Sequence, residues 1–127
     1  MTSNVQRGYY EIQGLTELLP GETTAEATLT GEGFFEGLYV VMGNIFVGRA
    51  RNKNDIVAFA PAISRFHAKF FAQNGAYFIE DLNSTNGTFV NGHPVKTPRY
   101  LQDGDSIELC NPEKGLEFRL RYHTAKG

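Results

Sequence analysis

Three polar clusters between residues 48 and 91 carry side chains that could bind an anion. They are Gly48-Arg49, the segment from Ser64 to His67, and the segment from Asn83 to Asn91. Each cluster lies where an apolar, strand-like run begins or ends, so each is expected on a loop or at its hinge. Together they supply two guanidinium groups, several hydroxyls, and amides beside a glycine, which are suitable donors for an oxyanion. The clusters therefore predict an anion site built from loops.

The net charge of −2 is unevenly distributed along the chain. Residues 1–47 hold one Arg and six Glu, a local net charge of −5. Residues 48–69 hold five basic side chains against Asp55 alone, a net charge of +4, and residues 70–127 have a net charge of −1. A small positive patch on a mildly acidic protein favours a small anionic ligand. It argues against nucleic acid, which usually requires a broad basic face.

The composition is typical of one folded intracellular domain. The 127 residues are 41% hydrophobic and 20% charged, which suits a globule large enough to bury a core. No apolar run approaches the roughly 20 residues of a membrane helix, and the N-terminus lacks the apolar region of a signal peptide. Cys110 is the single cysteine, so no intrachain disulfide is possible. We therefore expect a cytoplasmic protein without membrane insertion, and its oligomeric state stays open.

Short apolar runs separated by turn residues predict an all-β fold. Turn signals such as Asn74-Gly75 and Asn91-Gly92 separate these runs, and Asn-Gly at hairpin spacing favours a tight hairpin. No window has helical spacing. The pattern indicates a two-sheet antiparallel β-sandwich over residues 25–123, with an N-terminal extension (1–24) and a C-terminal tail (124–127). The expected strands are Glu26–Thr30, Gly37–Met42, Ile45–Gly48, Ile56–Phe59, Phe66–Ala72, Ala76–Asp81, Thr88–Val90, Ser106–Cys110 and Leu116–Tyr122.

Enzymatic interpretations of these residues are weaker. Ser64 and His67 could form a nucleophilic pair, but no third member stands out and no Gly-x-Ser-x-Gly motif is present. A metal site formed by His67, His93 and His123 is the other enzymatic alternative. We expect neither, and so predict no catalytic residues and no cofactor.

The segment from Asp81 to Gly92 invites two further interpretations that fail on inspection. It begins like a calcium loop, but Asn86 stands where that loop needs Gly, and Gly92 stands where it needs a bidentate Glu. Asn83 and Asn86 each begin a glycosylation sequence, which an intracellular chain would leave unmodified. A hydrogen-bonded turn that presents Thr85 and Asn86 remains as the expectation.

In combination, the clusters resemble the signature of the forkhead-associated (FHA) domain. That family has a Gly-Arg pair, then Ser-x-x-His, then Asn-Gly-Thr. Gly48-Arg49, Ser64 to His67, and Asn86 to Thr88 follow in that order and with the family's spacing. The resemblance covers roughly residues 25–122, and Asp81 to Gly92 matches the family pattern nearly throughout.

The resemblance implies a sandwich of about eleven strands, with ligand loops at one end, that binds phosphothreonine in a partner protein or peptide. It also implies a role in kinase-linked signalling. Ala62, Ile63 and Asn83 are expected to influence the neighbouring peptide positions. The residues expected to bind phosphate are Arg49, Ser64, Arg65 and Thr85; Asn86 is expected to bind the peptide backbone, and Gly48, His67 and Gly87 to support the loops.

Two alternatives stay open beside this interpretation. The same fold could act as a phosphate-independent interaction or oligomerisation module. Glu22-Thr23-Thr24, in the acidic N-terminal part, could be phosphorylated and occupy the domain's own site or a neighbour's. A solvated linker is the simpler interpretation of that segment.

Overall fold

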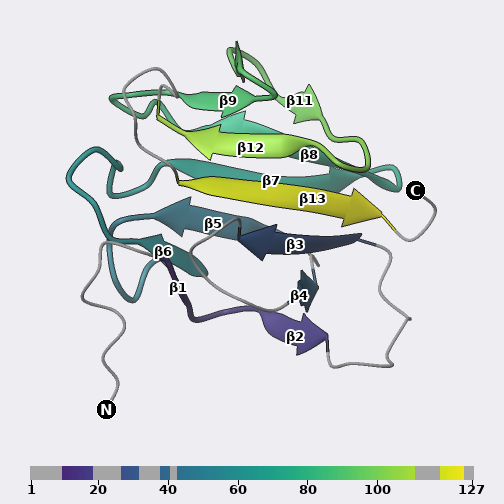
Figure 1. Ribbon diagram of the computed structural model, residues 1–127, viewed down its shortest axis with the longest axis horizontal. Coiled ribbons are helices and arrows are strands. Elements are labelled where there is room, and N and C mark those ends of the chain that lie inside the picture. The colour runs from purple at the N-terminus through teal and green to yellow at the C-terminus, as the bar shows by residue number, and fades with distance from the viewer. Residues whose placement is uncertain (1–9, 19–26, 32–37, 41–42, 111–117, 125–127) are drawn as a thin grey trace.

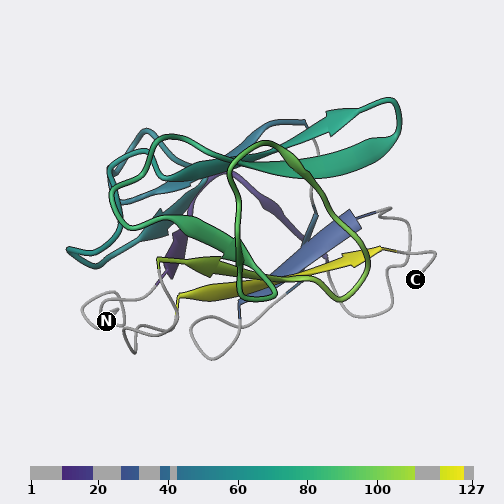
Figure 2. The ribbon, with the colours of Figure 1, turned by 90° about the horizontal axis from the view of Figure 1, so that it is seen from above.

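Strands make up the regular structure, and they form two sheets that pack face to face around one core (Figures 1 and 2). The computed structural model describes residues 10–18, 27–31, 38–40, 43–110 and 118–124. These residues contain thirteen strands, of which β10 and β11 are only two residues long. Within this part of the chain, no helix is long and apolar enough to span a membrane. The expected two-sheet sandwich is confirmed.

The two sheets contain six and seven strands. In order, the first sheet consists of β1 (Tyr10–Ile12), β6 (Ile56–Ala58), β5 (Ile45–Gly48), β7 (Ala68–Gln73), β8 (Ala76–Asp81) and β11 (Arg99–Tyr100). The second consists of β10 (His93–Pro94), β9 (Thr88–Val90), β12 (Ser106–Leu109), β13 (Arg119–Thr124), β3 (Ala27–Gly31), β4 (Leu38–Val40) and β2 (Thr16–Leu18). The paired neighbours are antiparallel except for β5 and β6, which run parallel.

The β7–β8 hairpin follows the predicted pattern closely. Asn74 and Gly75 separate the two strands and have φ angles of 55° and 81°. Positive φ at both central residues defines the tight turn that matches the twist of antiparallel strands. Asn91 and Gly92, between β9 and β10, have φ angles of 52° and 83° and make the same kind of turn.

Alternation along the strands determines which side chains fill the core. In β7, Ala68 and Phe70 are fully buried, whereas Phe71 points to the outer face and stacks on Phe78 with ring centroids 5.4 Å apart. Phe70 lies opposite Ile79 of β8 in the register, so one face of this pair packs inward. The largest fully buried apolar side chains come from both sheets and from two connecting segments: Leu29, Val47, Ile56, Ile63, Phe70, Ile79, Leu101, Ile107, Leu109 and Leu120.

Several strands differ from the sequence-based expectation. β1 and β2 lie within residues 1–24 and pair with β6 and β4, so part of the predicted extension contributes a strand to each sheet. The strand predicted from Phe66 starts at Ala68. Phe66 is 45% exposed, and the His67 side chain bonds to loop backbone. The short strands β10 and β11 were not predicted, because two residues carry too little periodicity.

The outward and inward faces of β7 can be distinguished by truncation. Phe70→Ala is expected to lower the free energy of unfolding by about 3–5 kcal/mol, because it opens a cavity in the core. Phe71→Ala removes a ring stacked on the outer face and is expected to cost about 1 kcal/mol. Urea unfolding of both variants measures the difference, and equal losses would contradict the assignment of faces.

Candidate functional site

The three predicted clusters meet at one end of the sandwich. Arg49 follows β5, Ser64 lies between β6 and β7, and Thr85 lies between β8 and β9. The amide of Arg49 donates to the carbonyl of Ser64 over 2.9 Å, and the amide of Thr85 donates to Ser64 Oγ over 2.9 Å. Ser64 therefore contacts both of the other loops. Loops that are up to 36 residues apart in sequence become one surface.

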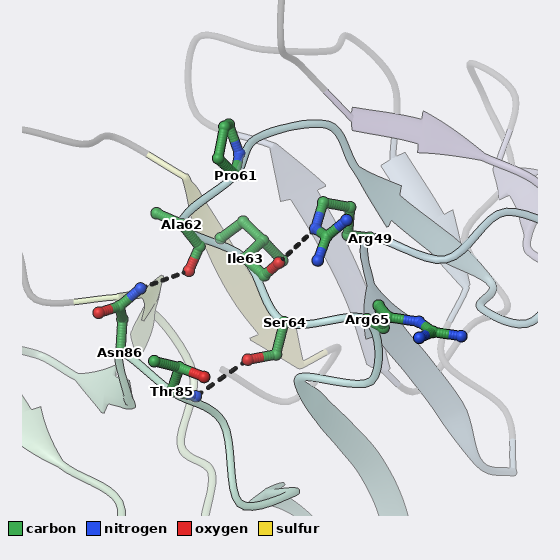
Figure 3. A pocket seen from close by; sticks show the side chains of 8 residues that line it. All are labelled: Arg49, Pro61, Ala62, Ile63, Ser64, Arg65, Thr85 and Asn86. Carbon is green, nitrogen blue, oxygen red and sulfur yellow. Dashed lines mark hydrogen bonds between the residues drawn. The ribbon is translucent and has the colours of Figure 1, made fainter.

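A pocket of about 330 Å³ opens between these loops (Figure 3). All five residues predicted to contact a ligand line this pocket, together with three neighbours. The lining residues are Arg49, Pro61, Ala62, Ile63, Ser64, Arg65, Thr85 and Asn86. Ala62 and Ile63 were expected to influence neighbouring peptide positions, whereas Pro61 was missed because an exposed loop proline gives no binding signal of its own. Asn83 is exposed and does not line the pocket.

Arg49 is held by the protein at one side of its guanidinium. Its Nε donates to the carbonyl of Ile63 over 2.8 Å, as Figure 3 shows. The two terminal amino groups remain for a ligand, and a guanidinium can bind a phosphate with two parallel bonds. The side chain thus enters the pocket in an orientation fixed before any ligand arrives.

Ser64 and Asn86 are oriented in a similar way. Ser64 Oγ accepts from the Thr85 amide, so its own hydroxyl hydrogen is available to donate. Asn86 Nδ2 donates to the carbonyl of Ala62 over 2.8 Å, which leaves its second N–H and its Oδ1. Arg65 is exposed, and its side chain extends away from Ser64 and Thr85 in Figure 3. Of the predicted phosphate residues, Arg65 is therefore the one that must reorient to meet a shared ligand.

His67 is buried and bridges two loop backbones. Its Nδ1 lies 3.1 Å from the amide of Ser64, which donates to it. Since Nδ1 accepts, the ring is neutral and Nε2 carries the hydrogen, which it donates to the carbonyl of Gly87 over 2.8 Å. Burial lowers the pKa of His67 below 6.5, consistent with a neutral ring, although the bond to Gly87 and the charge of Asp81 act in the opposite direction. Both ring nitrogens bind backbone groups, so neither is placed to accept a proton from the Ser64 hydroxyl.

Gly48 allows the first two clusters to approach each other. A Cβ at this position would lie 2.2 Å from the carbonyl oxygen of Arg65, closer than real Cβ atoms come. Asn54 is buried nearby, and its Nδ2 donates to the carbonyls of Ala50 and Arg65 over 2.9 Å each. Gly48 therefore permits a backbone contact that any side chain would prevent.

Asp81 organises the third loop. Its carboxylate accepts from the Ser84 amide over 3.0 Å, from the Ser84 hydroxyl, and from the Thr88 hydroxyl over 2.7 Å. Ser84 Oγ in turn accepts from the amide of Gly87, which has a φ of 92°. In the segment that began like a calcium loop, the Asp81 carboxylate is therefore engaged by donors of the same loop. No group of three or more potential metal ligands occurs in the ranges that the structure describes.

A family model described as the FHA domain matches residues 45–110. Among curated proteins, the transcriptional regulatory protein EmbR of Mycobacterium tuberculosis is 37% identical over 77 residues, which are 61% of this chain and 20% of EmbR. The glycogen accumulation regulator GarA of Mycolicibacterium smegmatis is 34% identical over 71 residues, which are 56% of this chain and 40% of GarA. The chain thus spans between a fifth and two fifths of these relatives.

Solved structures resemble most of this chain. Mycobacterium tuberculosis EmbR, solved in complex with a low-affinity phosphopeptide, superposes with a TM-score of 0.68 and 26% identity over 84% of this chain and 26% of that one. A structure from a study of phosphothreonine-dependent FHA domain interactions has a TM-score of 0.65 and 27% identity, over 79% of this chain and 97% of that one.

Because His67 is buried as a neutral ring, we expect the free energy of unfolding to fall in acid. Because its pKa is lowered from 6.5, the unfolded state binds more protons than the folded state between the folded pKa and 6.5. The stabilisation is complete above pH 6.5 and is lost as the pH falls toward the folded pKa, by at most about 1.4 kcal/mol per pH unit. Urea unfolding on both sides of pH 6.5 measures this slope.

His67→Gln is expected to be less stable and to have a smaller slope, whereas His93→Gln, at an exposed position, should keep the slope of the unmodified protein. An unchanged slope in His67→Gln would mean that another group is responsible.

Proposed function

Because the chain belongs to the FHA domain family, we propose that it binds phosphothreonine in a partner protein or peptide. The observation that carries this proposal is the convergence of Arg49, Ser64 and Thr85 on one pocket, with donors left free on the first two. Their remaining hydrogen-bond capacity faces a space large enough for a phosphate group. Such a binding module acts in protein–protein recognition downstream of a kinase.

The proposed roles follow from the orientation of each group. The terminal amino groups of Arg49 bind two phosphate oxygens, and the Ser64 hydroxyl donates to a third. Thr85 contributes its hydroxyl, and Arg65 turns toward the phosphate when the ligand binds. Asn86, fixed to Ala62, binds the peptide backbone beside the phosphothreonine. Gly48, His67 and Gly87 keep the loops in place, as their backbone contacts and bonds support.

Phosphorylation would control binding through charge. A phosphothreonine carries a charge of about −1.5 to −2 and three strong acceptors, whereas an unmodified threonine offers one neutral hydroxyl. Each hydrogen bond to a charged group contributes roughly 1.5–3 kcal/mol, so two or three would make binding depend on phosphate. The phosphopeptide bound to EmbR and the phosphothreonine-dependent interactions named for the second neighbour support this ligand class.

The proposal extends to a non-catalytic protein that works in the cytoplasm. The ring nitrogens of His67 both bind backbone, which argues against a role for this residue as a general base. Nucleic acid and membranes are not among the proposed partners, because the excess of positive charge is concentrated in residues 48–69 and does not form a broad basic face. The boundaries 25–123 for the binding domain remain part of the proposal, now with β1 and β2 adding to its sheets.

A phosphate-independent interaction is the second candidate, and the outer face of the first sheet favours it. Phe71 stacks on Phe78, and Tyr100, which is 54% exposed, packs edge-on against Phe78 with centroids 5.9 Å apart. Phe71 and Phe78 are half-buried, and aromatic side chains in a partly exposed cluster of this kind are common in protein interfaces. Binding through this face would not depend on Arg49 or on phosphate.

Replacing Arg49 separates the two candidates. Arg49→Ala is expected to weaken binding of a phosphothreonine peptide by at least about tenfold, since a charged hydrogen bond contributes 1.5 kcal/mol or more. Arg65→Ala should have a smaller effect, because this side chain extends away from the pocket before binding. Calorimetric titration with a degenerate phosphothreonine library and its unphosphorylated counterpart measures both.

The matched control is Lys96→Ala, which removes an exposed cation that does not line the pocket. Wild-type affinity in Arg49→Ala, or equal binding of the two libraries, would contradict the proposed site and favour the phosphate-independent module.

A further inference from the structure

A third arginine, besides Arg49 and Arg65, lies close to the pocket and has no role in the proposed phosphate contacts. Arg51 belongs to the turn between β5 and β6, two residues after Arg49. Two residues of chain span at most about 7 Å, so the two Cα atoms are close neighbours. Arg51 is exposed but is not one of the lining residues of the pocket.

The position of the Arg51 side chain is fixed by an aromatic ring. Its guanidinium carbon lies 4.7 Å from the centroid of the Phe59 ring. Phe59 is half-buried and precedes Pro61, a lining residue of the pocket, by two positions. The contact therefore joins the turn that carries Arg49 to the loop that carries Ser64. A guanidinium that packs over an aromatic ring keeps the N–H donors of its own plane available. It also loses less rotational freedom when it binds an anion.

No described acidic side chain forms an ion pair with the basic side chains at this edge. In the described residues, neither Arg51 nor Lys53 forms an ion pair, whereas Lys69 pairs with Glu80 at 3.8 Å. Asp55 is the one acidic side chain between residues 48 and 69, and its Oδ2 accepts from the amide of Phe46 over 2.9 Å. An anion brought by a ligand would therefore meet a local excess of positive charge.

We propose that Arg51, assisted by Lys53, binds a second anionic group of the ligand, within about three residues of the phosphothreonine in an extended peptide. The group is an Asp or Glu carboxylate or a second phosphoryl group. This inference rests on the proposed function, since it requires the phosphothreonine to occupy the pocket beside Arg49. It makes this edge of the site a determinant of ligand specificity.

A double-mutant cycle tests the proposal. The ligands are phosphothreonine peptides with neutral flanks and matched peptides in which one Glu, or one phosphoserine, is moved along either flank. At one position, the anionic peptide is expected to bind about two- to fivefold more tightly, the range of an exposed ion pair, with a larger gain for phosphoserine. Arg51→Gln should abolish most of that gain while the neutral peptide keeps its affinity.

Two further variants distinguish the effect of the Arg51 charge from the effect of its packing on Phe59. Arg51→Lys keeps the charge and should retain part of the gain, and Lys96→Gln, which removes an exposed cation that does not line the pocket, should retain all of it. A gain that is also lost in Lys96→Gln reflects general electrostatic attraction and overturns the assignment to Arg51.

Two other outcomes would overturn the inference in distinguishable ways. If the neutral phosphopeptide binds through Arg49 and no anionic flank improves its affinity, the second contact is wrong and the proposed function stands. If no phosphothreonine peptide binds at all, the proposed function and this inference fail together.

Discussion

The buried imidazole of His67 is the contact on which the geometry of the site depends. It accepts a hydrogen bond from the amide of Ser64 and donates one to the carbonyl of Gly87, which belong to different loops. Only the neutral ring can make both bonds, and burial favours that form by lowering the pKa. Because Ser64 also receives the amide of Thr85, the ring determines how far apart the second and third loops lie. The pocket forms because the two loops are held at this separation.

Around this bridge, the functional side chains divide their hydrogen-bonding capacity between the protein and the pocket. Arg49 uses Nε to bind Ile63, Ser64 uses one lone pair to receive Thr85, and Asn86 uses one N–H to bind Ala62. The hydrogen-bonding groups that remain free on each side chain are oriented by the bond that the side chain already makes to the protein. Groups oriented in advance lose less conformational entropy on binding, so more of the interaction energy is available for affinity.

The acidic side chains near the site accept hydrogen bonds from the protein and leave the basic side chains for a ligand. Asp81 accepts the hydroxyl and amide of Ser84, and Asp55 accepts the amide of Phe46. Both carboxylates are thereby engaged within the loops and do not pair with Arg49 or Arg51. The basic side chains of residues 48–65 keep their charge for a ligand, although the chain as a whole has a net charge of −2.

The sequence by itself determined the strands with clear alternation, the Asn74-Gly75 hairpin turn and the residue types of an anion site. These features follow from the geometry of neighbouring residues, which a local pattern records. β1, β2, β10 and β11 were not predicted, because these short segments can be recognised as strands only through the partners with which they pair elsewhere in the chain. Tertiary structure alone decided the neutral tautomer of His67, the engagement of Asp81, and the stacking of Arg51 on Phe59. Each depends on which atoms the packed loops bring within hydrogen-bonding or van der Waals distance, and no local pattern encodes that.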